Sequence, residues 1–300
     1  MNEIESSTAT RTGRDGQVVK GPRIWLDMDQ KELDDAYDQA CWAPNREYIQ
    51  KRRRVASERA IARIGLPERA SYGPTEIEKL DIYKTRRPNA PINIFIHGGA
   101  WRGGLAKDSA YMAEMYLAAG AHFIVPDFVW VQDAGGSLMT MADQVRRAVA
   151  WVYKNAASFG GDPSRLYLSG HSSGAHLGGV VVTTDWRKDF GLPADIIKGA
   201  LSKRSQYVKF DDPTEEGLSA QRHLDRLNTP LTIAYGTLES PEFQRQSRDF
   251  AAAVKAAGKP VELIVGEGFN HFEMQETMGN PFGLGGRAAL EMMKLKLGAA

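Results

Sequence analysis

A short apolar run that leads directly into a glycine-bounded serine constrains this chain most. Leu166-Tyr167-Leu168 has the composition of a buried strand and is followed by Gly170-His171-Ser172-Ser173-Gly174. The next stretch, Ala175–Val182, is small and apolar, as in a helix packed tightly on a sheet. This order predicts a strained turn that holds Ser172 at the edge of a sheet, with glycines where a Cβ would clash. Because G-x-S-x-G also occurs in ordinary turns, the function of Ser172 depends on what the rest of the chain supplies.

Strand-like and helix-like segments alternate on both sides of this turn. Strands are expected at 80–83, 92–96, 123–126, 166–168, 196–201, 231–235 and 261–265. Helices are expected at 110–119, 139–155, 243–257 and 288–297, and 66–74 has the composition of a loop. The alternation predicts an α/β fold in which helices flank a mostly parallel central sheet.

The N-terminal part of the chain differs from the rest in composition and in hydrophobic pattern. Residues 1–20 are rich in Ser, Thr, Gly and charge and are expected to form a flexible tail. Helical periodicity over 31–41 and 48–64 predicts a helical segment or cap at 21–75, ahead of a main α/β domain at 76–300 in a chain with a single domain overall. The basic run Lys51-Arg52-Arg53-Arg54 is explained better by a solvated helix face than by a nucleic-acid site.

Composition excludes several classes of protein. Lys and Arg number 38 against 37 Asp and Glu, so a net charge of +1 gives no bulk field for nucleic acid or an anionic membrane. The single cysteine, Cys41, excludes an intrachain disulfide and a cysteine-based metal site. No apolar run approaches the ~20 residues that span a bilayer, and the N-terminus lacks the apolar core of a signal peptide. We expect a cytoplasmic protein that acts on a small molecule without cofactor or metal; a homodimer remains an open alternative.

A second glycine turn follows the apolar run 92–96. In His97-Gly98-Gly99-Ala100-Trp101, the glycine pair frees backbone N–H groups to point at a ligand. A serine that attacks an acyl carbon creates a negatively charged oxygen, which needs such preorganised donors. We expect an oxyanion hole made by the Gly98-Gly99 turn, with the N–H groups of Gly99, Ala100 and Ser173 as donors. A tight turn without a binding role is the alternative.

A serine hydroxyl also needs a general base and a carboxylate that orients it. His271 follows the last expected strand in a glycine-rich loop, at the edge where ligands of open α/β sheets bind. Glu239 follows the strand at 231–235 and is the expected acid, with Glu242 as second choice and Asp211 or Asp212 as remote candidates. Structural roles are expected for the remaining histidines, which are His97, His122, His171, His176 and His223.

With HGGAW, GHSSG, GTLES and NHF in this order, the chain resembles the α/β-hydrolase fold. It is most similar to the carboxylesterase and arylformamidase (kynurenine formamidase-like) branch, over roughly residues 30–297. The resemblance implies a catalytic domain at 76–300 that transfers an acyl group through a serine ester. By position, Ser172, Glu239 and His271 correspond to the triad of this family, and Gly98, Gly99 and Ser173 to its oxyanion hole.

The chain departs from the family at three places. Glu239 stands where Asp is usual, and Ser173 where Ala is usual; we expect activity to survive both changes. The strand at 196–201 runs directly into Ser202-Lys203-Arg204-Ser205, where relatives continue with an apolar segment that lines the pocket. We therefore expect part of the pocket wall to be missing or rebuilt.

The sequence thus predicts a metal-free serine hydrolase that cleaves an amide or ester of a small, aromatic or apolar substrate. The formamidase-like N-terminus favours an amide. Aromatic residues near strand ends are expected to line the substrate pocket, namely Trp101, Phe128, Trp130, Phe269 and Phe272. A general carboxylesterase is one alternative. A non-catalytic binding protein with the same fold is the alternative from another class.

Overall fold

The computed structural model describes residues 20–202 and 212–297. The expected tail at 1–20 therefore lies outside the described residues except for its last position, as do Lys203-Arg204-Ser205 and the candidate acid Asp211.

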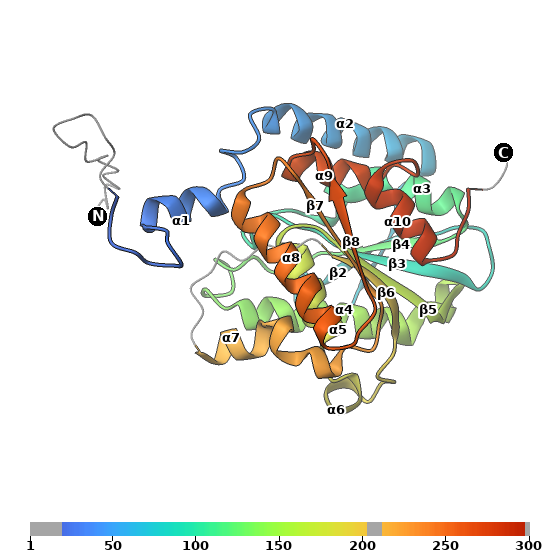
Figure 1. The fold of residues 1–300 in the computed structure, drawn as a ribbon. Helices are drawn as coiled ribbons and strands as arrows, with labels where there is room; N and C mark the ends of the chain where they lie inside the picture. Colours follow the sequence, from blue (N-terminus) through green and yellow to red (C-terminus); the bar gives the residue numbers. More distant parts are fainter. Residues whose placement is uncertain (1–19, 203–211, 298–300) are drawn as a thin grey trace, which may run out of the picture.

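One eight-stranded sheet forms the centre of the molecule (Figure 1). In spatial order its strands are β1 (Glu68–Ser71), β2 (Lys79–Tyr83), β4 (His122–Pro126), β3 (Ala90–Ile96), β5 (Gly161–Gly170), β6 (Ile197–Ser202), β7 (Leu231–Gly236) and β8 (Val261–Gly266). Pairing is antiparallel from β1 to β4 and parallel from β4 to β8. The carboxyl ends of β3, β5, β7 and β8 therefore meet along one edge.

Helices cover both faces of this sheet because its central strands are apolar on both sides. Ile92, Ile94 and Ile96 of β3 pack in one cluster with α4 (Leu138–Asn155), α5 (Ser173–Val182) and α8 (Pro241–Ala256). Phe95, between them in sequence, points to the other face and joins a second cluster. That cluster includes the 3-10 turn η1 (Ala106–Met112), α3 (Ala113–Ala118) and α10 (Leu284–Met292). The period of two along β3 thus divides the core into two layers.

Two N-terminal helices add a wall beside this core. Asp29 caps α1 (Gln30–Tyr37) in a capping box with Glu32, which satisfies free N–H groups of the first turn. Tyr37 packs edge-on against Phe243 of α8, with ring centroids 5.9 Å apart. The longer α2 (Arg46–Ile64) lies beside η1 and α3 (Figure 1).

The structure differs from the sequence-based expectation at several elements. The expected loop at 66–74 contains β1, whose short, exposed sequence Glu-Arg-Ala-Ser has no apolar alternation. Backbone pairing with β2 forms this strand, and Arg69 bridges Asp81 and Asp127 across it. The expected helix at 110–119 is divided into η1 and α3. Three helices were not anticipated, α6 (Trp186–Phe190), α7 (Asp212–Leu218) and α9 (His271–Thr277).

Every helix within residues 20–202 and 212–297 is too short or too polar to cross a membrane.

Candidate active site

Ser172 occupies a strained turn between β5 and α5. Its φ of 58° and ψ of −129° lie in a region that L-residues rarely adopt. A Cβ on Gly170 would lie 2.7 Å from the carbonyl oxygen of Gly174, and one on Gly174 would lie 2.1 Å from that of Ile96. Only glycine fits at either position, so the backbone passes close to β3 and Ser172 remains half-buried at the sheet edge.

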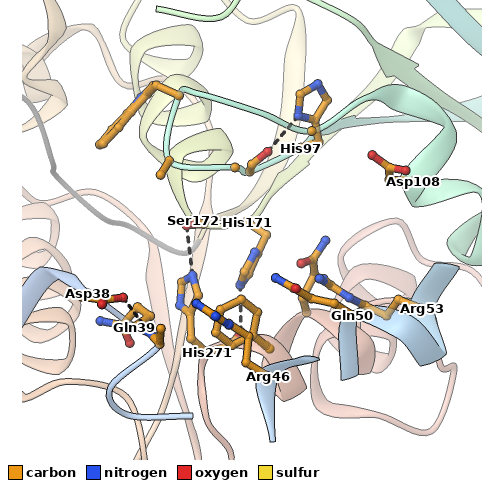
Figure 2. A pocket seen from close by; sticks show the side chains of 18 of the residues that line it. Asp38, Gln39, Arg46, Gln50, Arg53, His97, Asp108, His171, Ser172 and His271 are labelled. Atoms are coloured by element: carbon orange, nitrogen blue, oxygen red, sulfur yellow. Dashed lines mark hydrogen bonds between the residues drawn. The ribbon is translucent and has the colours of Figure 1, made fainter. Parts of the chain in front are cut away.

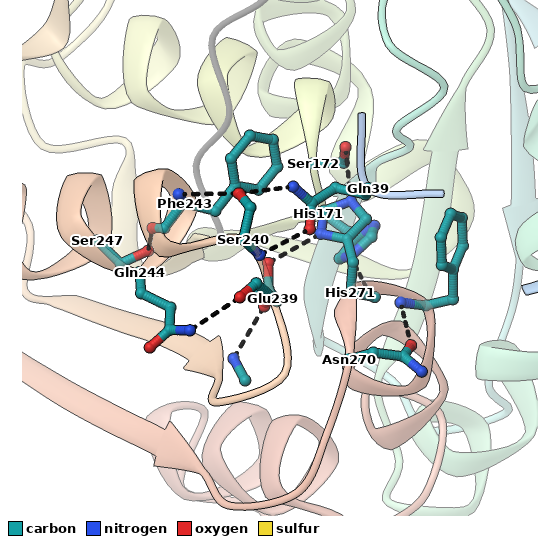
Figure 3. Close-up of polar contacts among 12 residues, drawn as sticks. Gln39, His171, Ser172, Glu239, Ser240, Phe243, Gln244, Ser247, Asn270 and His271 are labelled. Carbon is teal, nitrogen blue, oxygen red and sulfur yellow. Dashed lines mark hydrogen bonds and ion pairs between the residues drawn. The ribbon is translucent and has the colours of Figure 1, made fainter. Parts of the chain in front are cut away.

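Ser172, His271 and Glu239 form one chain of hydrogen bonds (Figure 3). The Oγ of Ser172 is 3.0 Å from Nε2 of His271, and Nδ1 of His271 is 2.9 Å from Oε2 of Glu239. Because a carboxylate only accepts, Nδ1–H donates to Glu239 and Nε2 accepts the Ser172 proton. Both His271 and Glu239 are buried, with exposed fractions of 4% and 2%. Their burial strengthens the interaction and holds the imidazole in one tautomer.

The loop that carries Glu239 is fixed from several sides. The second carboxylate oxygen of Glu239 accepts the Gly236 N–H at 2.8 Å, and the Gln244 amide donates to its backbone carbonyl at 2.8 Å. Gln39, just beyond α1, forms two hydrogen bonds with Ser240, the residue that follows Glu239 (Figure 3). Through Gln39, the N-terminal segment therefore helps to position the loop that carries Glu239.

The loop that carries His271 is fixed in a similar way. Asn270 caps α9 and its side-chain amide donates to Asn45, at the start of α2. The His171 ring lies beside that of His271, with Nε2 of His171 bonded to the His271 carbonyl at 3.0 Å. A turn residue next to the serine thus holds the backbone of the histidine.

The alternative acids lie elsewhere. Glu242 is buried, but it pairs with Arg245 and accepts a hydrogen bond from the Tyr37 hydroxyl. Asp212 is an exposed residue at the start of α7. Among the carboxylates considered from the sequence, the structure brings Glu239 to His271.

The glycine turn after β3 lies directly against the serine turn. A Cβ on Gly98 would be 2.7 Å from the His171 carbonyl oxygen, and Gly99 has a φ of 129°. Ala100 and Trp101 also have positive φ values, 52° and 62°, which turn the backbone sharply. The Trp101 N–H donates to the Oγ of Ser173 at 3.2 Å, so the Ser173 side chain ties the two turns together.

The backbone donors expected at this turn have no acceptor in the described part of the protein. The N–H groups of Gly99, Ala100 and Ser173 make no hydrogen bond there, although neighbouring amides do. Gly98, Gly99 and Ala100 line the same cavity as Ser172. Such unpaired donors are available to a ligand oxygen beside the serine.

The remaining histidines have packing partners. His97 stacks on Phe128 at 4.3 Å, and burial lowers its pKa, so its ring stays neutral near pH 7. His122 accepts the Thr85 N–H, and His176 and His223 bond to the carbonyls of Leu218 and Glu216. His97 and His171 also line the cavity. Within the described ranges, no group of three or more His, Cys, Asp or Glu side chains could hold a metal ion.

A cavity of about 800 Å³ opens in front of Ser172 (Figure 2). This volume lies within the range of ligand pockets that hold a small organic molecule. Its lining includes the aromatic side chains of Tyr37, Trp101, Phe243 and Phe272. Phe243 of α8 was not expected there, because helical spacing alone placed it in the core.

Three of the expected aromatic residues do not line this cavity. Phe128 is buried behind the glycine turn, against His97. Trp130 is half-buried and donates its indole N–H to the Gly104 carbonyl. Phe269 is half-buried, and its carbonyl packs against Gly236. Position near a strand end did not determine the direction of these side chains, so the prediction was wrong for them.

The polar part of the cavity wall was missed by sequence reasoning. It comes from the N-terminal helices and includes Asp34, Asp35, Asp38, Arg46, Gln50, Arg53 and Arg54. The spacing of Arg46, Gln50 and Arg53 places them on one face of α2, which is a signal that the sequence contained. The basic run therefore does not act as a single solvated face: Arg52 pairs with Glu276 on α9, whereas Arg53 points toward the cavity.

Comparisons with known proteins find hydrolases that are similar to this chain. A protein-family model described as BD-FAE matches residues 80–211. The chain is 28% identical over 281 residues to the kynurenine formamidase of Danio rerio, covering 85% of this chain and 93% of that protein. It is 24% identical over 245 residues to the isoprenylcysteine alpha-carbonyl methylesterase ICME of Arabidopsis thaliana, covering 68% and 56%. A thermophilic esterase from Thermogutta terrifontis has a similar structure, with a TM-score of 0.59 and 22% identity over 77% of this chain and 91% of that one.

The esterase structure supports the fold, while the sequence relatives support the chemistry. These relatives are named as a formamidase and a methylesterase, and both are enzymes. They give no support to a non-catalytic binding protein. The chain therefore has the α/β-hydrolase fold, is similar to arylformamidases and carboxylesterases, and is an enzyme that acts on amide or ester bonds.

Proposed function

We propose that the protein is a serine hydrolase in which Ser172 is the nucleophile, His271 the general base and Glu239 the acid. The observation that carries this proposal is the chain of hydrogen bonds from Ser172 Oγ through His271 to Glu239, at 3.0 and 2.9 Å. The first distance allows proton transfer from Ser172 to His271, and the second lets Glu239 orient the imidazole. The unpaired N–H groups of Gly99, Ala100 and Ser173 serve as the oxyanion hole.

The reaction proceeds through an acyl-enzyme. Ser172 Oγ attacks the carbonyl carbon while His271 Nε2 takes the hydroxyl proton, and the carbonyl oxygen becomes negative in the oxyanion hole. The bond to the leaving group then breaks, and His271 returns the proton to the departing amine or alcohol. Water, deprotonated in turn by His271, attacks the Ser172 ester and releases the acid. Glu239 stays ionised and stabilises the imidazolium that forms in each half of the cycle.

An aryl formamide is the substrate class that we favour. The Danio rerio relative, a kynurenine formamidase, aligns over 93% of its own length and 85% of this chain. Trp101, Phe243 and Phe272 supply flat apolar surface for an aromatic ring. Residues 21–75 then act as a cap on the catalytic domain at 76–300.

A general carboxylesterase is the second candidate. It is favoured by the methylesterase relative, and the same triad and oxyanion hole serve both reactions. A comparison of rates on esters and formamides distinguishes the two.

Turnover of 4-nitrophenyl acetate and N-formylkynurenine by the parent protein and by Ser172→Ala tests the proposal. We expect the parent to hydrolyse both, with the higher kcat/KM on the formamide, and the variant to lose about 10⁴- to 10⁶-fold in kcat. Ser172 is half-buried and its turn needs no Oγ to form, so Tm should stay within a few degrees. Equal turnover by parent and variant would contradict the serine mechanism, and a preference for the ester would favour the carboxylesterase.

A further inference from the structure

One face of α2 forms a basic wall of the cavity in front of Ser172. Arg46, Gln50 and Arg53 come from this face, and Figure 2 shows their side chains extending from α2 toward the side of the pocket that holds His171 and His271. Arg54 also lines the cavity but is exposed, so water can hydrate its guanidinium.

Arg53 differs from its neighbours because part of its guanidinium is buried without a partner. Its Nε and Nη1 atoms are inaccessible to solvent and have no hydrogen-bond acceptor in the described part of the chain. A guanidinium cannot lose its proton in a protein, so this charge persists at all relevant pH values. Two buried N–H donors without an acceptor are costly, which indicates that a partner for this part of the guanidinium is missing from the free protein.

No described carboxylate of the cavity compensates Arg53. The Asp108 carboxylate accepts the Leu105 N–H on its own turn. On the α1 side, Asp34 accepts from Gln30, Asp35 pairs with Lys31, and Asp38 accepts the Ala40 N–H.

The phenol beside Arg53 does not compensate it either. Burial raises the pKa of Tyr111, with the Arg53 charge opposing that rise, so the ring is neutral. Its hydroxyl donates to the Gln275 carbonyl. Tyr111 thus gives Arg53 a neutral neighbour and no negative charge, so a ligand anion is the partner that its buried Nε and Nη1 atoms lack.

We propose that Arg53 binds a carboxylate of the substrate and makes the enzyme selective for amides or esters that carry such a group away from the scissile bond. This inference rests on the proposed function of Ser172. The planar fork of a guanidinium matches the two oxygens of a carboxylate, and hydrogen bonds between charged partners are about twice as strong as neutral ones. A doubly charged phosphate suits the cavity less well, because Asp34, Asp35 and Asp38 on its other wall would repel it more strongly.

A matched pair of substrates isolates the effect of that one charge. N-formylkynurenine carries a carboxylate, and its α-carboxamide differs from it by the loss of this negative charge. We expect the parent to have a kcat/KM about 10- to 100-fold higher on the carboxylate than on the carboxamide. Arg53→Gln should remove most of this preference by raising KM for the carboxylate, with little change of kcat/KM for the carboxamide. Arg53→Lys should restore part of it, because the point charge remains without the planar fork.

Arg59→Gln is the matched control, since Arg59 is an exposed residue of the same helix and lies outside this cavity. It should retain the parental preference. Equal kcat/KM of the parent on the two substrates, or an equal loss on both in Arg53→Gln, would overturn the role of Arg53. Turnover of 4-nitrophenyl acetate that requires Ser172 reports on the proposed function separately, because this ester carries no carboxylate.

Discussion

The reacting groups and the cavity wall in front of them are held in different ways. The serine and glycine turns consist of backbone locked between strands, where an added Cβ at Gly174 would lie 2.1 Å from a carbonyl oxygen. The wall formed by α1 and α2 is joined to the rest of the protein through side chains. Some contacts are apolar, such as Tyr37 against Phe243 and Ile61 against the second core cluster, and others are polar, such as the pair Gln39 and Ser240. The proposed triad, which needs fixed geometry, thus lies at the sheet edge, while the selectivity that we propose depends on the N-terminal helices.

The largest effect that would test this difference is expected at Glu239. Glu239→Gln keeps the size of the side chain but removes its charge and presents an amide to His271 Nδ1. We expect kcat to fall about 10⁴-fold, as when the acid of a serine triad is neutralised. Steady-state kinetics on 4-nitrophenyl acetate measure this loss.

Glu242→Gln is the matched control for that variant. It removes the ion pair with Arg245 in the same loop region, so it should lower the free energy of unfolding by about 1–3 kcal/mol and change kcat less than about fivefold. A reversed ranking of the two variants in kcat would show that the acid was assigned to the wrong glutamate.

A smaller, local effect is expected at the glycine turn. In Gly99→Ala the new Cβ would lie 2.1 Å from the Gly103 carbonyl oxygen, and a φ of 129° is unfavourable for alanine. The turn must therefore shift, and its N–H groups would no longer point to the position of the oxyanion. We expect kcat/KM to fall about 10²- to 10³-fold, comparable to the loss of one oxyanion donor.

Gly103→Ala provides a comparison four residues away, because a Cβ there meets nothing within 4 Å. Its kcat/KM should stay within about threefold of the parent. If Gly99→Ala were as active as Gly103→Ala, the oxyanion would have to be held elsewhere.

The smallest effect is expected where the wall contacts the acid loop. Gln39→Ala removes both hydrogen bonds to Ser240, next to Glu239, at a buried site. We expect kcat to fall about two- to tenfold through looser placement of Glu239, with KM nearly unchanged. Gln30→Ala, an exposed residue of α1, should leave kcat at the parental value. If kcat of Gln39→Ala fell as far as that of Glu239→Gln, the N-terminal wall would be as important for the reaction as the proposed triad.

Sequence patterns predicted the rigid part of the molecule better than the wall. Buried strands such as β3 carry continuous apolar runs, and the glycines that flank Ser172 are required by close backbone contacts, so both leave a local signature. Ser172, Glu239 and His271, which we propose as the triad, each follow a strand of one sheet, and this placement could be predicted from the chain order.

Features that depend on contacts between distant segments have no comparable pattern in the local sequence. β1 exists through pairing with β2, although its own residues are polar. Whether Arg53 faces solvent or the cavity depends on how α2 docks beside η1, which no local pattern specifies. The directions of Phe128, Trp130 and Phe269 also depend on packing that is set by distant segments.

The contact between Gln39, just beyond α1, and Ser240, next to Glu239, has an evolutionary consequence. Residues 30–54 supply much of the cavity wall but none of the three residues that we propose as the triad. Mutations in this stretch can alter the range of accepted compounds while the bond-breaking apparatus is inherited intact. Libraries of variants at Arg46, Gln50 and Arg53 are therefore an efficient way to search for variants of this enzyme that accept new substrates.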